Sequence, residues 1–414
     1  MTSAAVDRRV RRWAEQRAAI DAEVRDKGVE LAPKAAAGGL EAMAEFRLAA
    51  RRMRGFDDID REFAAQAERR AARAEACESA GRMESARESH FIAALLWSAA
   101  IWPLFEVNET AAAYERRMTQ AYGRFAALMD RPIERVEIPF GEKFLPAYPH
   151  LPHRPAPGER FAAILVIGGL DTNKETQIAL HGDRLLTRGL AALAIDGPGQ
   201  GEALGRGIVM TESNHGDAAL AAVAFLARHP AIDATRIAIR GNSFGSYFGT
   251  VAAARLGDRI AGFAASGICQ EPGLATLRDT APPTYKQRMM LMSGYEEEAE
   301  FDRFAQRFDL RPLAGSIRAP YMILAGAEDR LSPVAATYDL FERIAAPKRL
   351  LVYEGAGHGI RDGAAAEHGE EKGVVIADWL KARLAGEPFR SEKVWIDATG
   401  AARAEPYRQA RLSA

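Results

Sequence analysis

A serine on a tight turn between a strand and a helix constrains this chain more than any other feature of its sequence. Residues 236–240 contain a short apolar run in which Ile237 and Ile239 lie on one face, and a small-residue helical segment begins at position 244. The turn reads Gly241-Asn242-Ser243-Phe244-Gly245, the pattern G-x-S-x-G. A serine on such a turn has strained backbone angles, and its neighbours two residues away cannot carry bulky side chains. The pattern predicts that Ser243 is a nucleophile raised above a sheet edge.

The sequence on both sides of this turn alternates apolar strands with helices. After an expected strand pair at 136–140 and 144–148, we expect strands at residues 162–167, 191–195, 237–239, 262–266, 321–324 and 349–353. Helices are expected between them, at residues 175–188, 215–228, 244–256, 334–344 and 372–384. This βαβ alternation predicts an α/β protein with a mostly parallel sheet and helices on both faces. In such sheets the reactive loops lie at the carboxyl ends of the strands.

A chain of 414 residues is too long for one minimal core, and two domains are expected. The first 132 residues are rich in Ala, Arg and Glu at helical spacing and predict four or five helices. The apolar helix at 91–105 favours a bundle with its own core. The expected division is therefore an all-helical cap and dimerisation domain at 1–132, a catalytic domain at 133–390 with extra helices near the site at 269–314, and a C-terminal tail at 391–414.

Composition excludes several classes of function. The net charge is −1, which provides no basic surface for nucleic acid. Two cysteines, Cys77 and Cys269, fit a reducing cytoplasm and no disulfide framework. The uncharged run at 91–105 is shorter than the about 20 apolar residues that span a bilayer. The histidines and cysteines lack metal-ligand spacing, so we expect no metal. Taken together, these observations predict a cytoplasmic protein with no cofactor and no membrane partner.

A serine nucleophile needs a base, and the base needs an acid that orients it. Of the eight histidines, only His358 follows a strand end, in the glycine-rich loop Glu354-Gly-Ala-Gly-His-Gly downstream of the serine. The acid is expected at Asp329, which ends the turn Ala325-Gly-Ala-Glu-Asp; the adjacent Glu328 is expected to face solvent. The order Ser–Asp–His along the chain is that of α/β-hydrolases.

Acyl transfer also needs donors for a developing oxyanion. The N–H of Phe244 is one, and the N–H of Leu170 in the loop after an early strand is the other, with Gly169 as the neighbouring alternative. Glu271 is either a surface glutamate or a substrate contact. The segment Asp196-Gly-Pro-Gly-Gln-Gly lacks the spacing of a dinucleotide loop and is expected to form a structural turn near the site.

These motifs resemble the α/β-hydrolase superfamily. Together with Gly168-Gly169-Leu170-Asp171 and the helical N-terminus, they are similar to the group of 2,6-dihydroxypseudooxynicotine hydrolase, the fungal yellowish-green polyketide hydrolases and the FrsA-like esterases. The resemblance implies Ser243, His358 and Asp329 as the triad, Phe244 and Leu170 as the oxyanion hole, a helical cap over the substrate, and a homodimer. One C–C hydrolase of this group uses a glutamate after the nucleophile helix, for which Glu271 is the nearest candidate.

The sequence thus predicts a serine hydrolase that forms an acyl-enzyme. The expected substrate is a small molecule, partly apolar or aromatic, enclosed between the cap and residues 269–314. Hydrolysis of an ester and of a C–C bond beside a ketone both stay open, with amide or carbamate cleavage behind them. Two alternatives use the same residues differently: an acyl transferase, and a non-catalytic binding or regulatory protein on a hydrolase scaffold.

Overall fold

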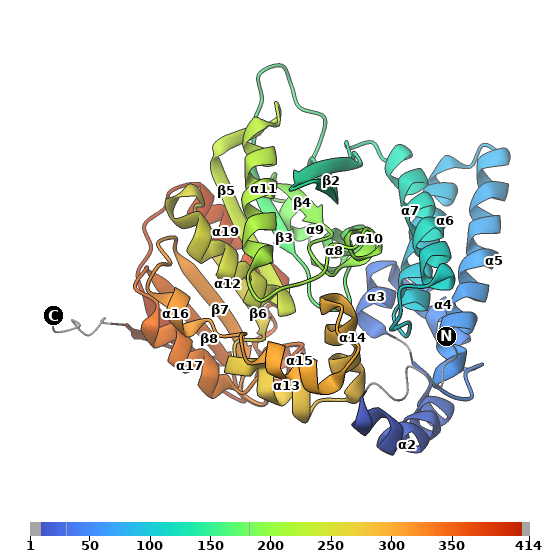
Figure 1. The fold of residues 1–414 in the computed structure, drawn as a ribbon. Coiled ribbons are helices and arrows are strands. Elements are labelled where there is room, and N and C mark those ends of the chain that lie inside the picture. Colours follow the sequence, from blue (N-terminus) through green and yellow to red (C-terminus); the bar gives the residue numbers. More distant parts are fainter. Residues whose placement is uncertain (1–9, 30, 182, 408–414) are drawn as a thin grey trace.

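The computed structural model describes residues 10–29, 31–181 and 183–407. Ten strands form one sheet in the order β1-β2-β4-β3-β5-β6-β7-β8-β9-β10 (Figure 1). All neighbouring pairs from β4 through β9 are parallel, whereas β1, β2 and β10 pair antiparallel at the two edges. The bounds are β1 Val136–Phe140, β2 Lys143–His150, β3 Phe161–Ile167, β4 Ala191–Ile195, β5 Ile232–Ser243, β6 Phe263–Ile268, β7 Tyr321–Gly326, β8 Lys348–Tyr353, β9 Glu392–Ile396 and β10 Ala402–Pro406.

The two faces of the sheet are covered by different helices. The side chains of α11 (Asn214–Arg228), α12 (Phe244–Leu256) and α17 (Val334–Arg343) pack on one face. Those of α8 (Lys174–His181), α9 (Asp183–Leu186), α18 (Ala364–His368) and α19 (Lys372–Leu384) pack on the other. The central strands are buried on both sides because helices cover both faces, which explains their nearly continuous apolar sequences. The predicted α/β class, with helices on both faces of a mostly parallel sheet, is confirmed.

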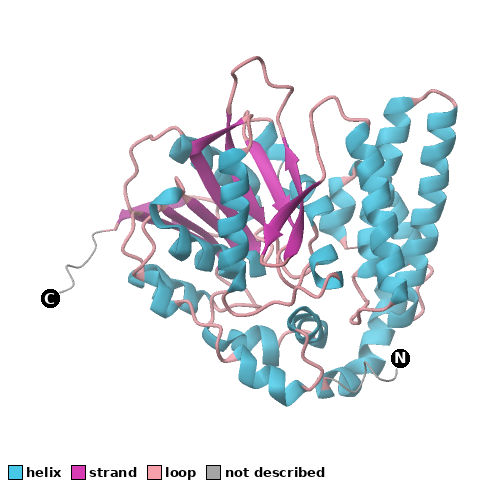
Figure 2. Ribbon diagram, turned by 45° about the horizontal axis from the view of Figure 1, so that its top comes forward, coloured by secondary structure: helices cyan, strands magenta, loops and turns pink. Residues whose placement is uncertain are grey.

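Helices before the sheet form a separate group at one side of it. Within the described residues these are α2 (Arg11–Lys27), α3 (Ala32–Ala37), α4 (Gly39–Ala50), α5 (Ile59–Ser79), α6 (Met83–Ile101) and α7 (Glu109–Ala127). Figure 2 shows the longest of them standing alongside one another beside the strands. They outnumber the four or five expected, because the first expected segment is divided: α2 ends before Gly28, and the short helix α3 follows it.

The apolar interior of these helices is not a core of its own, contrary to the expectation. Residues 92–100 of α6 are all buried, as expected for a central helix. However, bundle residues such as Trp13 and Phe46 belong to one continuous cluster with the sheet residues Leu165 and Phe244. The helical segment therefore folds against the sheet, and apolar burial holds the two together.

Two segments differ from the sequence expectation. The expected tail at 391–414 contains β9 and β10, which extend the sheet beyond β8; Val394 and Ile396 alternate into the core with 5% and 0% exposure. The run Val394-Trp395-Ile396 is short and lies among charged and small residues, so the pattern resembled a polar tail. The expected helix at 175–188 is divided into α8 and α9.

The long connection between β6 and β7 is helical. It contains the short helix Pro272–Leu274, α13 (Ala275–Asp279), α14 (Pro283–Ser293), α15 (Glu298–Ala305) and α16 (Arg311–Ala314). Helix α14 contacts α2 of the N-terminal group, and Arg288 donates a hydrogen bond to the carbonyl of Trp102. This connection therefore lies between the sheet and the helical segment.

Candidate active site

Ser243 is the last residue of β5 and immediately precedes α12. Its backbone has φ 56° and ψ −127°, a conformation that a residue with a side chain rarely adopts. The two glycines of the turn explain why the conformation is possible. A Cβ on Gly241 would lie 2.2 Å from the carbonyl oxygen of Gly245, and a Cβ on Gly245 would lie 2.2 Å from that of Ile167. The predicted lack of room beside the serine is confirmed.

The three residues expected to act together lie within hydrogen-bond distance. The Nε2 atom of His358 lies 2.9 Å from Ser243 Oγ, and its Nδ1 atom lies 2.8 Å from Asp329 Oδ2. Ser243 ends β5, whereas His358 and Asp329 come from loops after β8 and β7, and the carboxyl ends of these strands meet at one edge of the sheet. This geometry lets the imidazole take the serine proton while the carboxylate holds the ring.

Backbone donors orient the Asp329 carboxylate. Its Oδ1 atom accepts hydrogen bonds from the N–H of Leu331, at 2.8 Å, and of Ser332, at 3.3 Å, which leaves Oδ2 for the histidine. The Asp329 side chain is fully buried, whereas Glu328 is exposed. Glu328 therefore faces solvent as expected, and Asp329 alone of the two carboxylates reaches His358.

The loop that carries Leu170 lies against the serine. A Cβ on Gly169 would lie 2.9 Å from Ser243 Cβ and 3.2 Å from the carbonyl oxygen of Asn242, so this position requires glycine. On the other side, the N–H of Phe244 belongs to the first turn of α12, where backbone N–H groups are free to bind an anion. The arrangement brings the loop of Gly169 and the first turn of α12 to the nucleophile, and the oxyanion role of the Leu170 and Phe244 N–H groups stays a prediction.

Gln200 holds this loop in place, and the sequence did not single it out. Its Nε2 donates to the carbonyl oxygens of Gly168, at 3.1 Å, and Gly169, at 2.8 Å. The Gly169 carbonyl and the Leu170 N–H belong to the same planar peptide unit, so fixing one fixes the direction of the other. Gln200 lies in the turn Asp196-Gly-Pro-Gly-Gln-Gly, which was expected to be structural; its position after a strand was the available signal.

A cavity of about 220 Å³ opens at Ser243 and His358. The helical segment supplies one wall through Leu31, Pro33, Lys34 and Trp102, and α14 supplies Tyr285. The catalytic part supplies the rest: Gly169, Leu170, Asp171, Thr172, Asn242, Gly359, Arg361 and Lys372. Leu170, Asp171 and Trp102 also line an adjoining cavity of about 100 Å³ between α7 and α14. The space beside the serine thus lies between the two parts of the chain.

Glu271 and Cys269 follow β6 but have different surroundings. The Glu271 carboxylate accepts the N–H of Thr276 at 2.6 Å near the start of α13, and Glu271 does not line the cavity at Ser243. The Cys269 thiol is buried beside Ser243; burial, together with the charge of Asp329, raises its pKa. The cysteine therefore stays a thiol and does not compete as a nucleophile.

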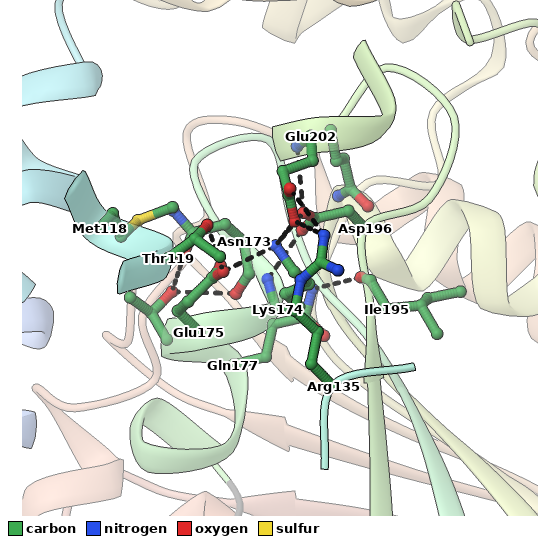
Figure 3. Close-up of polar contacts among 12 residues, drawn as sticks. Met118, Thr119, Arg135, Asn173, Lys174, Glu175, Gln177, Ile195, Asp196 and Glu202 are labelled. Atoms are coloured by element: carbon green, nitrogen blue, oxygen red, sulfur yellow. Dashed lines mark hydrogen bonds and ion pairs between the residues drawn. The ribbon is translucent and has the colours of Figure 1, made fainter. Parts of the chain in front are cut away.

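A buried group of charges connects the loops that surround the site (Figure 3). The Lys174 ammonium lies 2.7 Å from Glu175 Oε1, 2.9 Å from Asp196 Oδ2 and 2.7 Å from Glu202 Oε2. We call these four residues the Lys174 cluster. Thr119 of α7 donates to Glu175, so the cluster also reaches the helical segment. Burial alone would lower the pKa of Lys174, but the three carboxylates raise it well above its usual value.

An open, mostly parallel sheet with a serine on the turn after a central strand defines an α/β-hydrolase, a class of hydrolytic enzymes. The family model of FrsA-like esterases matches residues 61–268, which include most of the helical segment and the nucleophile turn. The chain belongs to the FrsA-like family of esterases. A second model, of the prolyl oligopeptidase family, matches residues 184–386.

Individual relatives are hydrolases. The chain is 27% identical over 270 residues to 2,6-dihydropseudooxynicotine hydrolase of Paenarthrobacter nicotinovorans, a match covering 64% of this chain and 69% of that protein. It is 28% identical over 185 residues to esterase FrsA of Photobacterium profundum, covering 45% of this chain and 42% of that one, so it spans less than half of this relative. The crystal structure of 2,6-dihydroxy-pseudo-oxynicotine hydrolase superposes with a TM-score of 0.72 at 24% identity, covering 86% of this chain and 96% of that one.

Two further findings concern the described part of the chain alone. None of its helices is long and apolar enough to cross a membrane. Among the same residues, no group of three or more His, Cys, Asp or Glu side chains is arranged to hold a metal ion.

Proposed function

We propose that this chain is a serine hydrolase that cleaves a carbonyl-containing small molecule through an acyl-enzyme. The observation that carries the proposal is the continuous hydrogen-bonded line from Ser243 through His358 to Asp329, beside a cavity. In the first step Ser243 Oγ attacks the carbonyl carbon while His358 Nε2 takes its proton. The buried Asp329 carboxylate stabilises the imidazolium, and the N–H groups of Phe244 and Leu170 hold the oxyanion.

The intermediate then collapses and expels the leaving group. His358 gives its proton to that group, an alcohol oxygen in an ester or an enolate carbon in a ketone whose C–C bond breaks. A water molecule next loses a proton to His358, attacks the acyl carbon and releases a carboxylic acid. The steps are the same for both substrate classes, and the leaving group alone differs.

The cavity supports a substrate of modest size with an apolar or aromatic part. Leu31, Trp102 and Tyr285 contribute apolar surface around the serine. Ester hydrolysis and C–C hydrolysis are both supported, the first by the family and the second by the relative that acts on a pseudooxynicotine. Glu271 adds nothing to the second candidate, because its carboxylate is engaged with Thr276 outside the cavity.

Activity measurements with the wild type and Ser243→Ala test this proposal. Both proteins are assayed on p-nitrophenyl esters of graded chain length and on aryl 1,3-diketones, and each is labelled with a fluorophosphonate. We expect turnover of one class and an adduct on Ser243 in the wild type alone. Full activity in the variant would exclude the serine mechanism, and a wild type with neither turnover nor adduct would indicate a binding protein. Products measured with added alcohols separate hydrolysis from acyl transfer.

We also propose that the chain divides into a cap at 1–132 and a catalytic domain at 133–390. The same proposal includes a homodimer and a cytoplasmic location. Light scattering on the purified full chain measures the oligomeric state. A mass of one chain would contradict the dimer, whereas the mass of two chains would support it.

A further inference from the structure

The cavity at Ser243 is lined by more positive than negative groups. Lys34, Arg361 and Lys372 face it, and Asp171 is the single carboxylate among its lining residues. Lys34 is already engaged, because its ammonium donates to Ser98 Oγ at 2.9 Å. Burial lowers its pKa to about 8, and the charge of Asp171 opposes this shift. Among the described residues, Lys372 and Arg361 are the positive groups of this cavity whose side chains have no hydrogen-bond or ion-pair partner.

Lys372 is buried without a partner in the described part of the chain. The residue is 5% exposed, and no hydrogen bond or ion pair from a described residue reaches its ammonium. Glu371, its neighbour in sequence, is paired instead with Arg184 at 2.8 Å. A buried charge is costly unless it is paired, so an unpartnered lysine indicates that something else supplies the anion.

The position of Lys372 increases this cost. It is the first residue of α19, where the helix dipole disfavours a cation. Burial lowers its pKa to about 7, and the charges of Arg361 and Arg240 act in the same direction, opposed by those of Glu371 and Asp329. Like charges held close together beside the catalytic serine are the arrangement that binds an anion.

We propose that Lys372 and Arg361 bind a carboxylate carried by the substrate, so that the preferred substrates are esters or ketones with an anionic group away from the scissile carbonyl. This inference rests on the proposed function, because it places the anion in the cavity where Ser243 acts. Lys372 supplies the buried charge, and Arg361, exposed three residues after His358, supplies a second donor at the cavity wall.

Matched substrates that differ only in charge test the proposal. One pair is the mono-4-nitrophenyl ester of adipic acid and its methyl ester, with the charge on the acyl side. The other is 4-carboxyphenyl butanoate and its methyl ester, with the charge on the leaving group. We expect the wild type to prefer the acid in at least one pair, measured as the ratio of the two kcat/KM values.

The variants Lys372→Met and Arg361→Met are each expected to lower that ratio by about 10-fold or more, which corresponds to about 1.4 kcal/mol of binding. Lys372→Arg keeps the charge and should retain most of the preference. Lys381→Met removes an exposed lysine from the same helix and is the matched control, expected to leave the ratio unchanged. Circular dichroism checks the fold of each variant, and Arg361→Met provides the test if Lys372→Met fails to fold.

Two outcomes overturn the anion site: a wild type that shows no preference for the acid in either pair, or variants that lower acid and methyl ester turnover equally. Failure of the proposed function looks different. In that case Ser243→Ala cleaves both members of a pair as fast as the wild type. Cleavage of the methyl esters through Ser243 without a preference for the acids leaves the hydrolase in place and removes the carboxylate site alone.

Discussion

The imidazole of His358 and the carboxylate of Asp329 are joined by a 2.8 Å contact between Nδ1 and Oδ2 in a place where the carboxylate is shielded from water. The contact makes Nδ1 the protonated nitrogen and leaves Nε2 to accept the serine proton. Because the aspartate is fully buried, water cannot take over this role when the carboxylate is replaced.

Asp329→Asn therefore should lower kcat by about 10³- to 10⁴-fold with little change in folding, since an amide can donate to Nδ1 and favours the wrong tautomer. Glu328→Gln is the matched control, because this neighbouring carboxylate is exposed. Steady-state kinetics on the best ester or ketone measure both. Equal loss in the two variants would contradict the assignment of Asp329.

Gln200→Leu should lower kcat more than it raises KM. The variant removes the donor that holds the Gly169 carbonyl and so frees the peptide unit that carries the Leu170 N–H. A misdirected oxyanion donor costs about 10²-fold in kcat. Gln306→Leu, at an exposed glutamine, serves as the control. A variant with unchanged kcat would show that the loop keeps its position without Gln200.

Lys174→Met should destabilise the fold by about 3–5 kcal/mol, because it leaves the buried carboxylates of Glu175 and Asp196 without their cation. Urea unfolding followed by fluorescence measures the change. Lys27→Met removes a lysine that is 74% exposed and should change stability by less than about 0.5 kcal/mol. A stable Lys174→Met protein would mean that the carboxylates take up protons at little cost.

Glu115 gives stability a pH dependence. This glutamate of α7 lies near the Lys174 cluster, and burial together with the charge of Asp196 raises its pKa to about 8. Because the pKa of Glu115 is higher in the folded protein than in the unfolded chain, the folded protein binds this proton more tightly. The stability that the proton contributes is therefore lost as pH rises from about 5 to 8. Glu115→Gln removes the effect, and its melting temperature relative to the wild type should increase across that range. A constant difference between the two proteins would contradict the raised pKa.

Much of the fold and of the site was predictable because the signals are local. Strands β3, β4, β7 and β8 appear as short apolar runs, and Ser243 and His358 follow two strand ends within glycine-rich turns. Parallel strands bring such turns to one edge, so the pattern of elements was enough to place them together. By contrast, β9 and β10 have too few apolar residues to stand out, and they depend on pairing with β8.

The sequence by itself determined the class of fold, the nucleophile turn and the order of the serine, aspartate and histidine, because periodicity and glycine spacing act over a few residues. The tertiary structure alone decided what surrounds them. Gln200, the Lys174 cluster and Lys372 resemble ordinary polar residues in the sequence, and their roles arise from burial and from partners far away along the chain. The cost of a buried charge depends on which groups meet it in space, and the sequence does not record that distance.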